Sequence, residues 1–166
     1  MPRNALIIMD MQKCFINDKT KKLSKMIKCH IEKNSYDFVV FSKFQNKNTS
    51  SFATKLNWTK CIEENDREIC EILKKTAKDN NVFEKKTYSI FKIKKFNNFL
   101  RERKVKKLYF CGIDLDACIL ASAYEAFDLG YDFEILFNLS GSTSEPNLFS
   151  QSRKIINRNL TQERPC

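Results

Sequence analysis

The sequence predicts an α/β domain with a doubly wound, mainly parallel sheet of five or six strands flanked by helices, a Rossmann-like three-layer sandwich. Five short apolar runs alternate along the chain with amphipathic, Lys-rich stretches, and this alternation is typical of a parallel sheet covered on both faces. The chain has 166 residues, 42% of them hydrophobic and 14 of them Phe, which is enough to build one core. We therefore expect a single domain over residues 1–166, without a linker or an internal repeat.

The first half of the chain predicts three strands and two helices. Residues 5–9 (ALIIM) and 38–44 (FVVFSKF) are runs of branched and aromatic side chains, which favour buried strands. Between them, residues 19–33 form a Lys-rich helix, and a polar loop follows the second strand. The spacing of apolar side chains predicts a second helix over 63–78, and a weak third strand follows at 82–84.

The second half continues the alternation. Residues 91–103 are a basic amphipathic helix, 107–113 (KLYFCGI) a clear fourth strand, and 115–129 a helix that Gly130 caps at its C-terminus. A fifth strand at 131–137 and a last helix at 144–159 complete the pattern. In such sheets, ligands bind beyond the carboxyl ends of the strands, at the point where the strand order reverses. Functional side chains are therefore expected directly after the strands.

The composition narrows the chemistry. The single histidine, His30, excludes a metal site built on several His, and it excludes a His-based triad unless His30 itself serves. Three Gly and three Pro leave no room for a glycine-rich phosphate loop. The seven Cys are scattered without a Cys-x-x-Cys pair, which favours free thiols in a reducing compartment over a disulfide framework. No apolar stretch approaches the roughly 18 residues of a membrane span, so we expect a cytoplasmic protein.

The net charge of +10 raises nucleic acid, an anionic membrane or an acidic substrate as partners. However, the charge comes mostly from 23 Lys and accompanies 15 Asn, a combination that an AT-rich coding bias also produces. The basic stretch 85–107 interleaves ten basic residues with Phe91, Phe96 and Phe99. Its periodicity favours a solvated helix face above core-facing Phe side chains over a nucleic-acid surface.

Three reactive side chains follow predicted strand ends: Asp10, Lys85 and Cys118. If the first and fourth strands are neighbours, Asp10 and Cys118 face one crevice. Cys118 then lies in the first turn of a helix, where free backbone N–H groups and the positive helix end favour the thiolate. Asp10 would accept the thiol proton, and the same N–H groups would receive an oxyanion. The alternative is that Cys118 is an ordinary small, buried residue.

Three separated stretches carry a resemblance to a known family: ALIIMDMQKCF, FEKKTYSIF and LYFCGIDLDACILASAYEAFDLGY. Together they resemble the isochorismatase-like cysteine hydrolases, a superfamily that includes nicotinamidases and N-carbamoylsarcosine amidase. The middle stretch FQNKNTSSF and the following LNWTKC are similar to one branch of uncharacterised small cysteine hydrolases. The resemblance runs from residue 5 to about residue 160, in the right order and spacing.

The resemblance implies a catalytic triad of Asp10, Lys85 and Cys118 that hydrolyses a C–N bond through a thioester. Asp10 would take and return the proton, and Lys85 would hold the charges in place. The backbone N–H groups of Asp114 and Cys118 would be the oxyanion donors, and a cis peptide bond would join Ile113 to Asp114.

The family also implies a small-molecule amide as substrate, with Phe15, Asn46 and Trp58 as candidate substrate-binding residues. We expect no cofactor for this chain, and members of the family commonly assemble into dimers or larger homo-oligomers. Metal-bearing nicotinamidases carry an Asp-x-His and a second His after the second strand, where this chain has SKFQ at 42–45. We therefore expect a metal-independent enzyme.

Two departures from the family pattern motivate a second hypothesis, a binding or interaction module that keeps the fold without turnover. Leu115 replaces the family's Thr in the turn before the cysteine, and TSEPNLFSQS lacks the Gly-rich segment and the His of the related branch. Nucleic-acid binding through 85–107 is a third, less favoured hypothesis.

Overall fold

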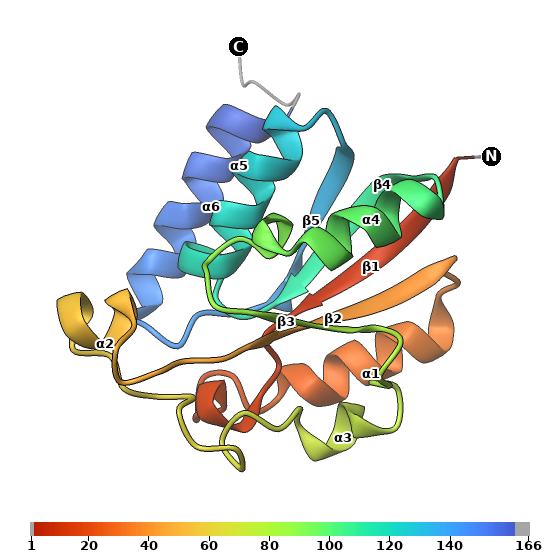
Figure 1. Cartoon of the computed structure of the whole chain (residues 1–166). Helices are drawn as coiled ribbons and strands as arrows, with labels where there is room; N and C mark the ends of the chain where they lie inside the picture. Colours follow the sequence, from red (N-terminus) through yellow and green to blue (C-terminus); the bar gives the residue numbers. More distant parts are fainter. Residues whose placement is uncertain (1, 162–166) are drawn as a thin grey trace.

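A computed structural model describes residues 2–161, and its five strands form one all-parallel sheet in the order β3-β2-β1-β4-β5 (Figure 1). The strands are β1 (Arg3–Met9), β2 (Phe38–Phe44), β3 (Val82–Lys85), β4 (Val105–Gly112) and β5 (Asp132–Ser140). The strand order reverses at β1, which pairs with β2 on one side and β4 on the other. The predicted doubly wound sheet is confirmed, and the carboxyl ends of β1 and β4 are neighbours.

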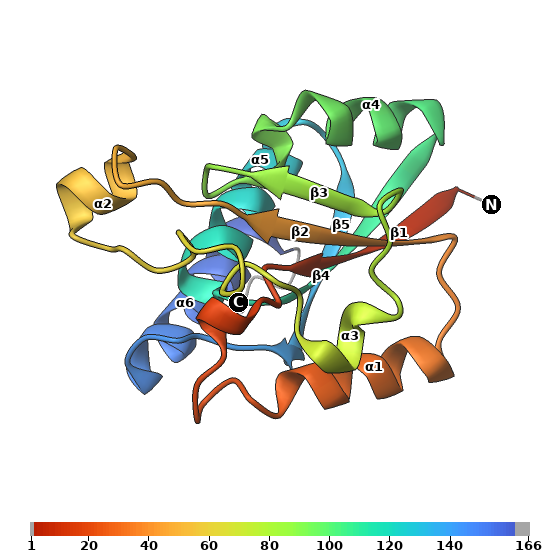
Figure 2. The same cartoon turned by 60° about the horizontal axis from the view of Figure 1, so that its bottom comes forward.

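Helices cover both faces of the sheet, as Figures 1 and 2 show. One face carries α1 (Leu23–Lys33) and α3 (Glu71–Lys74), and the other carries α4 (Lys94–Glu102), α5 (Leu120–Asp128) and α6 (Pro146–Leu160). Leu6 and Ile8 pack in the core on the α1 side, whereas Ile7 and Met9 pack in the core on the α4–α6 side. This alternation follows from the two-residue period of a strand, and burial on both faces explains why 5–9 is apolar throughout.

Short turns and one extra helix lie between these elements. The 3-10 turns are η1 (Lys13–Phe15) and η2 (Ile90–Lys92), and a π-helical turn, η3 (Leu115–Ile119), leads into α5. Helix α2 (Ser51–Leu56) lies where only a polar loop and an unassigned segment were expected. Its signal is Ser50, whose side chain accepts a hydrogen bond from the Ala53 N–H at 3.1 Å as an N-cap.

The prediction of a helix over 63–78 is wrong for most of its length, because only Glu71–Lys74 is helical. The backbone groups of the preceding residues instead form hydrogen bonds with the loop after β1. The N–H groups of Lys13 and Cys14 donate to the carbonyls of Glu68 and Asp66 at 2.9 Å, and the Cys70 N–H donates to the Met11 carbonyl. Tertiary hydrogen bonds have therefore replaced the helical ones that the periodicity predicted.

The basic stretch 85–107 places its aromatic side chains as predicted. Phe91 and Phe96 are buried in the core beneath α4, and Phe99 packs against the same core.

Among residues 2–161, no helix combines the length and the apolar composition that crossing a membrane requires.

The prediction that all seven cysteines are free thiols is also wrong, because Cys14 and Cys61 form a disulfide. Cys29, Cys70, Cys111 and Cys118 are free, and Cys166 lies outside the described residues. The two bonded cysteines are 47 residues apart in sequence, so spacing gave no signal for the pairing. The bond ties the loop after β1 to the loop that precedes α3.

Gly112, the last residue of β4, has a φ of +108° and lies against the backbone of Met9, where an added Cβ would be 2.2 Å from the Met9 carbonyl oxygen. We predict that Gly112→Ala lowers the free energy of unfolding by about 2–5 kcal/mol, since it adds backbone strain and overpacking. Gly130 is the matched control, because its φ is +75° but no atom lies within 4 Å of the added Cβ. Gly130→Ala should cost only about 1–2 kcal/mol. Urea unfolding of both variants measures the difference, and equal losses would contradict the close approach of β1 and β4.

For the disulfide, we predict that reduction lowers the free energy of unfolding by about 2–4 kcal/mol, because the unfolded chain regains the entropy of a long loop. Urea unfolding with and without a dithiol reductant measures this loss. The Cys14→Ser variant should match the reduced protein, whereas Cys29→Ser should retain the full response to reductant. Identical unfolding of the oxidised and reduced wild type would show that the crosslink contributes nothing.

Candidate active site

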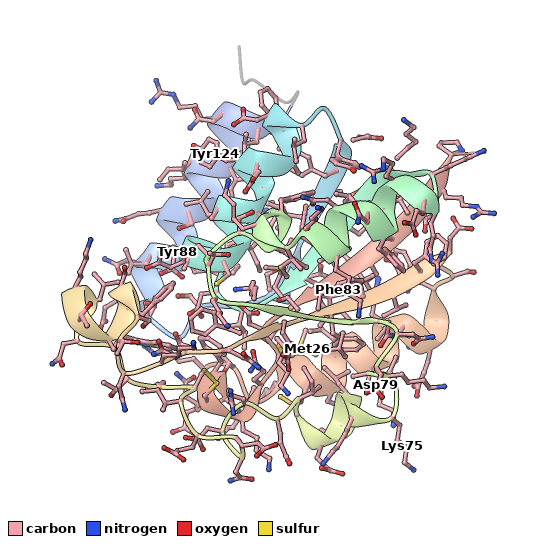
Figure 3. The ribbon with its side chains drawn as sticks, viewed as in Figure 1. Met26, Lys75, Asp79, Phe83, Tyr88 and Tyr124 are labelled. Atoms are coloured by element: carbon pink, nitrogen blue, oxygen red, sulfur yellow. A yellow bond between two sulfur atoms is a disulfide. The ribbon has the colours of Figure 1, made fainter. Side chains whose placement is uncertain are left out.

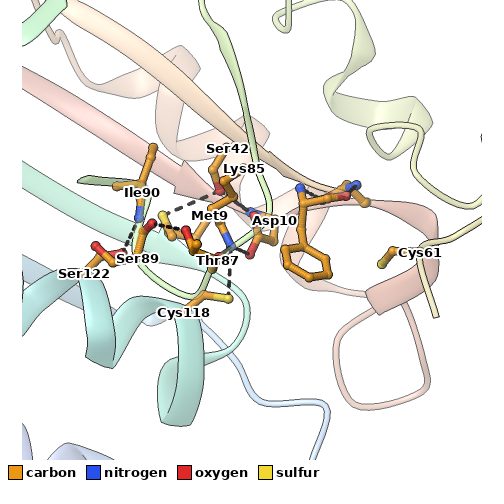
Figure 4. Close-up of polar contacts among 12 residues, drawn as sticks. Met9, Asp10, Ser42, Cys61, Lys85, Thr87, Ser89, Ile90, Cys118 and Ser122 are labelled. Carbon is orange, nitrogen blue, oxygen red and sulfur yellow. Dashed lines mark hydrogen bonds and ion pairs between the residues drawn. The ribbon is translucent and has the colours of Figure 1, made fainter. Parts of the chain in front are cut away.

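The three predicted catalytic residues meet beyond the carboxyl ends of the strands (Figure 4). The Nζ atom of Lys85 lies 2.7 Å from Oδ2 of Asp10 and 3.2 Å from Sγ of Cys118. The side chains of Asp10 and Lys85 are fully buried, and Cys118 is 7% exposed. Because β1 and β4 are neighbours, Asp10 and Cys118 lie at one place, and Lys85 from β3 contacts both.

Asp10 directly follows β1, with a φ of 47°, a left-handed conformation that Asp tolerates better than most residues. Its carboxylate is held by Ser42 on β2, whose hydroxyl donates to Oδ1 at 2.5 Å and accepts the Asp10 N–H at 3.0 Å. Apart from the Lys85 ammonium, Oδ2 has no hydrogen-bond donor among the described residues. One carboxylate oxygen is therefore fixed, and the other has a lone pair free for a proton.

Ser42 was missed as a site residue by reasoning from the sequence. The signal was present, because Ser42 is the one hydroxyl in the otherwise apolar and basic run FVVFSKF. A small polar side chain in a fully buried strand needs a partner, and the end of the neighbouring strand supplies Asp10.

Lys85 is the last residue of β3, and its ammonium has a partner for each of its three protons. Besides Asp10 and Cys118, it donates to the Thr87 carbonyl at 3.0 Å. The ammonium also lies 4.9 Å from the centre of the Phe44 ring, at a distance that suits a cation–π contact. Lys85 is therefore held in one position by all of its neighbours.

The electrostatics set the resting protonation state. Burial alone would lower the pKa of Lys85, but the charges of Asp10 and Cys118 raise it above its usual value, so Lys85 stays an ammonium. Burial raises the pKa of the Cys118 thiol, and the charge of Asp10 raises it further, while Lys85 opposes both. Burial therefore opposes the thiolate that the helix end is expected to favour, and that expectation stays a prediction.

The turn between β4 and Cys118 is clamped to the loop after β5. The Leu115 N–H donates to the Gly141 carbonyl at 2.8 Å, and the Asp114 carboxylate accepts hydrogen bonds from the N–H and the hydroxyl of Thr143 at 2.6 and 2.8 Å. The peptide bond between Ile113 and Asp114 is cis, as the resemblance implied. Leu115 is fully buried, so Asp114 and Thr143 hold this turn without the family's Thr hydroxyl.

A cavity of about 360 Å³ lies above Cys118. Its aromatic residues come from the segments around β1, β2, α2 and β3, and they are Phe15, Phe44, Phe52, Trp58 and Tyr88. Polar residues follow β4 and β5, and they are Asp114, Asp116, Thr143 and Ser144; Leu56 and Ala117 complete the lining. Figure 3 shows Tyr88 on the segment after β3, on the side of the molecule where α2 and the beginning of α6 lie.

The predicted substrate-binding residues take different positions. Phe15 and Trp58 line the cavity and stack on each other, with ring centres 5.7 Å apart. Asn46 does not line it, because its amide donates to the carbonyls of Trp58 and Lys60 and its oxygen accepts from the Ser50 hydroxyl. Asn46 instead orders the loop that carries Trp58.

Phe52 and Tyr88 were missed as lining residues, since both lie in segments without a strong helix or strand pattern. Among residues 2–161, no group of three His, Cys, Asp or Glu side chains is placed to ligate a metal ion.

Comparison with known proteins places this site in a family. Residues 4–147 match the family described as Isochorismatase domain. A search of curated protein sequences finds no significant match to the chain.

Solved structures share the fold at low sequence identity. An isochorismatase-like hydrolase from Alkaliphilus metalliredigens has a TM-score of 0.82 and 14% identity, over 93% of this chain and 91% of that one. A pyrazinamidase/nicotinamidase from Streptococcus mutans has a TM-score of 0.79 and 23% identity, over 95% and 97%. The nicotinamidase from Bacillus subtilis has a TM-score of 0.78 and 21% identity, over 95% and 96%. Because the family match spans most of the sequence, the chain belongs to the isochorismatase domain family.

Proposed function

We propose that the protein hydrolyses a C–N bond of a small-molecule amide through a thioester on Cys118. The observation that carries the proposal is the Asp10–Lys85–Cys118 contact beneath a cavity that Cys118 lines. The nicotinamidases among the structural neighbours support an amide as the substrate. The residues themselves supply a base, a cation and a nucleophile, so the proposed reaction proceeds without a metal ion.

In the first step, Sγ of Cys118 attacks the amide carbon while its proton passes to Asp10. The free lone pair on Oδ2 makes Asp10 the acceptor, and Ser42 keeps its other oxygen in place. The Lys85 ammonium touches both groups, so it offsets the negative charge whether that charge lies on oxygen or on sulfur. A thiol that is protonated at rest is consistent with this order of events.

In the following steps, the carbonyl oxygen carries a negative charge that the backbone N–H groups of Asp114 and Cys118 would stabilise. The tetrahedral intermediate breaks its C–N bond, Asp10 gives its proton to the departing nitrogen, and a thioester remains. Water then attacks the thioester carbon, and its proton passes to Asp10. The C–S bond breaks, the acid departs, and the proton returns to Cys118. One water is consumed for each amide cleaved.

The test is release of ammonia from a panel of small primary amides. We predict that Cys118→Ala abolishes release, because no thioester forms without the nucleophile. We expect Asp10→Asn to lower kcat by about 10²–10⁴-fold, since it removes the proton acceptor. Acid quenching followed by intact-mass and peptide analysis should locate the acyl group on Cys118 in the wild type.

Cys29→Ser serves as the control, because Cys29 lies on α1 away from the cavity. The proposal fails if Cys118→Ala keeps the wild-type rate, or if the acyl group is found on another cysteine. Amide binding without ammonia release from any member of the panel would instead support the binding module.

The family resemblance also supports a homo-oligomer, dimer or larger, whereas the cytoplasmic location was expected from the scattered cysteines and the lack of a long apolar stretch. Both stay predictions, as does a single domain over residues 1–166. The Cys14–Cys61 disulfide removes two of the seven cysteines on which the reducing-compartment argument rested.

A further inference from the structure

Two carboxylates line the cavity without a matching positive charge. Asp114 and Asp116 both border the space above Cys118, and no Lys or Arg of residues 2–161 forms an ion pair with either. Their hydrogen bonds come from neutral donors only. Thr143 donates twice to Asp114, and the Ser142 hydroxyl donates to Oδ1 of Asp116 at 2.5 Å.

The negative charge of Asp114 is costly where it lies. Burial raises the pKa of Asp114 to about 6, the Thr143 hydrogen bonds oppose this, and the charges of Asp116 and Asp10 add to the rise. At neutral pH, Asp114 is still mainly ionised, so two like charges two residues apart share one partly enclosed space. Like charges repel most where water is excluded, and a bound cation would relieve the repulsion.

No cation of the protein fills this role among the described residues. The Lys85 ammonium already contacts Asp10, Thr87 and Cys118, and the carboxylate of Asp10 balances its charge. At the rim, Lys19 bonds the Ser144 carbonyl through Nζ at 2.7 Å rather than either carboxylate. The cavity lining itself contains no Lys, Arg or His.

The remaining lining residues also suit an organic cation. Five aromatic side chains border the cavity, and among them Phe15 and Trp58 are stacked and Phe52 lies edge-on to Tyr88. Aromatic faces attract ammonium and pyridinium groups through the ring quadrupole while repelling water from their surroundings. A strongly hydrated metal ion would gain nothing from these rings, whereas a weakly hydrated organic cation gains from both the rings and the carboxylates.

We propose that the amide hydrolysed by this protein is an organic cation, with a substituted ammonium or a quaternised ring nitrogen held between the aromatic residues and Asp114 and Asp116. The inference rests on the proposed function for the amide, and it adds the charge of the substrate. Asp114 and Asp116 are specificity-determining residues in this account, since they contact the charged group and leave the proton transfer to Asp10.

The test compares two amides of the same shape, 1-methylnicotinamide, which is a cation, and 3-methylbenzamide, which is neutral. Binding is measured by calorimetry on Cys118→Ser, so that turnover does not enter. We expect the cation to bind at least about tenfold more tightly, as cation–π and carboxylate contacts together allow. Asp116→Asn and Asp114→Asn, each in the Cys118→Ser background, should each reduce that preference, and added salt should weaken binding of the cation alone.

Asp128→Asn is the matched control, because it removes one negative charge at the exposed end of α5, outside the cavity lining. It should leave the preference unchanged. Equal affinity for the two amides, or a preference that survives both cavity substitutions, overturns the inference. Asp114→Asn removes a carboxylate that bonds Thr143, and this variant can unfold. In that case, the cation preference of the Cys118→Ser protein and its loss in the Asp116→Asn derivative still test the inference. A cation preference without ammonia release in the wild type would count against the proposed hydrolysis alone.

Discussion

The buried ion pair between Asp10 and Lys85 is the interaction on which the site depends. Two charges removed from water are tolerated only when their other hydrogen-bonding groups are satisfied, and removing one partner costs about 3–5 kcal/mol. Here Ser42 fixes the carboxylate, Thr87 and Phe44 hold the ammonium, and Cys118 is the one partner that reacts. The strand order β3-β2-β1-β4 brings these groups from four chain segments to one edge of the sheet.

The sequence alone predicted the strands well, because they depend on local patterns, and the family resemblance singled out Asp10, Lys85 and Cys118, which the structure brings into contact. A buried parallel strand is an unbroken apolar run. The residue that follows it lies at the carboxyl end of the sheet, where ligands bind in this fold class. Residues 63–70 were mispredicted because their periodicity is helical, while their hydrogen bonds go to the loop after β1. The Cys14–Cys61 bond and the role of Ser42 likewise depend on contacts between distant segments, which no local pattern encodes.

The segments that line the cavity are held in place by different interactions on its two sides. On the β1 side, the disulfide joins Cys14, next to Phe15, to the loop that carries Trp58, and Asn46 orders that same loop. On the β4 side, the Asp114–Thr143 hydrogen bonds join the turn before Cys118 to the loop after β5. The aromatic side is thus held covalently and by packing, whereas the acidic side is held by charge-assisted hydrogen bonds. This division places hydrophobic contact and charge recognition on separate parts of the same cavity.

The central claim is that Asp10 activates Cys118 by accepting the proton of its thiol, while the Lys85 ammonium contacts both side chains. The most direct measurement is the rate of iodoacetamide labelling of each cysteine in the wild type and in Asp10→Asn, read by peptide mass spectrometry. Cys29 serves as the reference, and protection of the fully buried Cys111 reports that the protein is folded. The account predicts that Cys118 is labelled faster than the other thiols, and that Asp10→Asn slows Cys118 by about tenfold or more relative to Cys29. A Cys118 rate that is no faster than that of Cys29, or that is unchanged in folded Asp10→Asn, would contradict it.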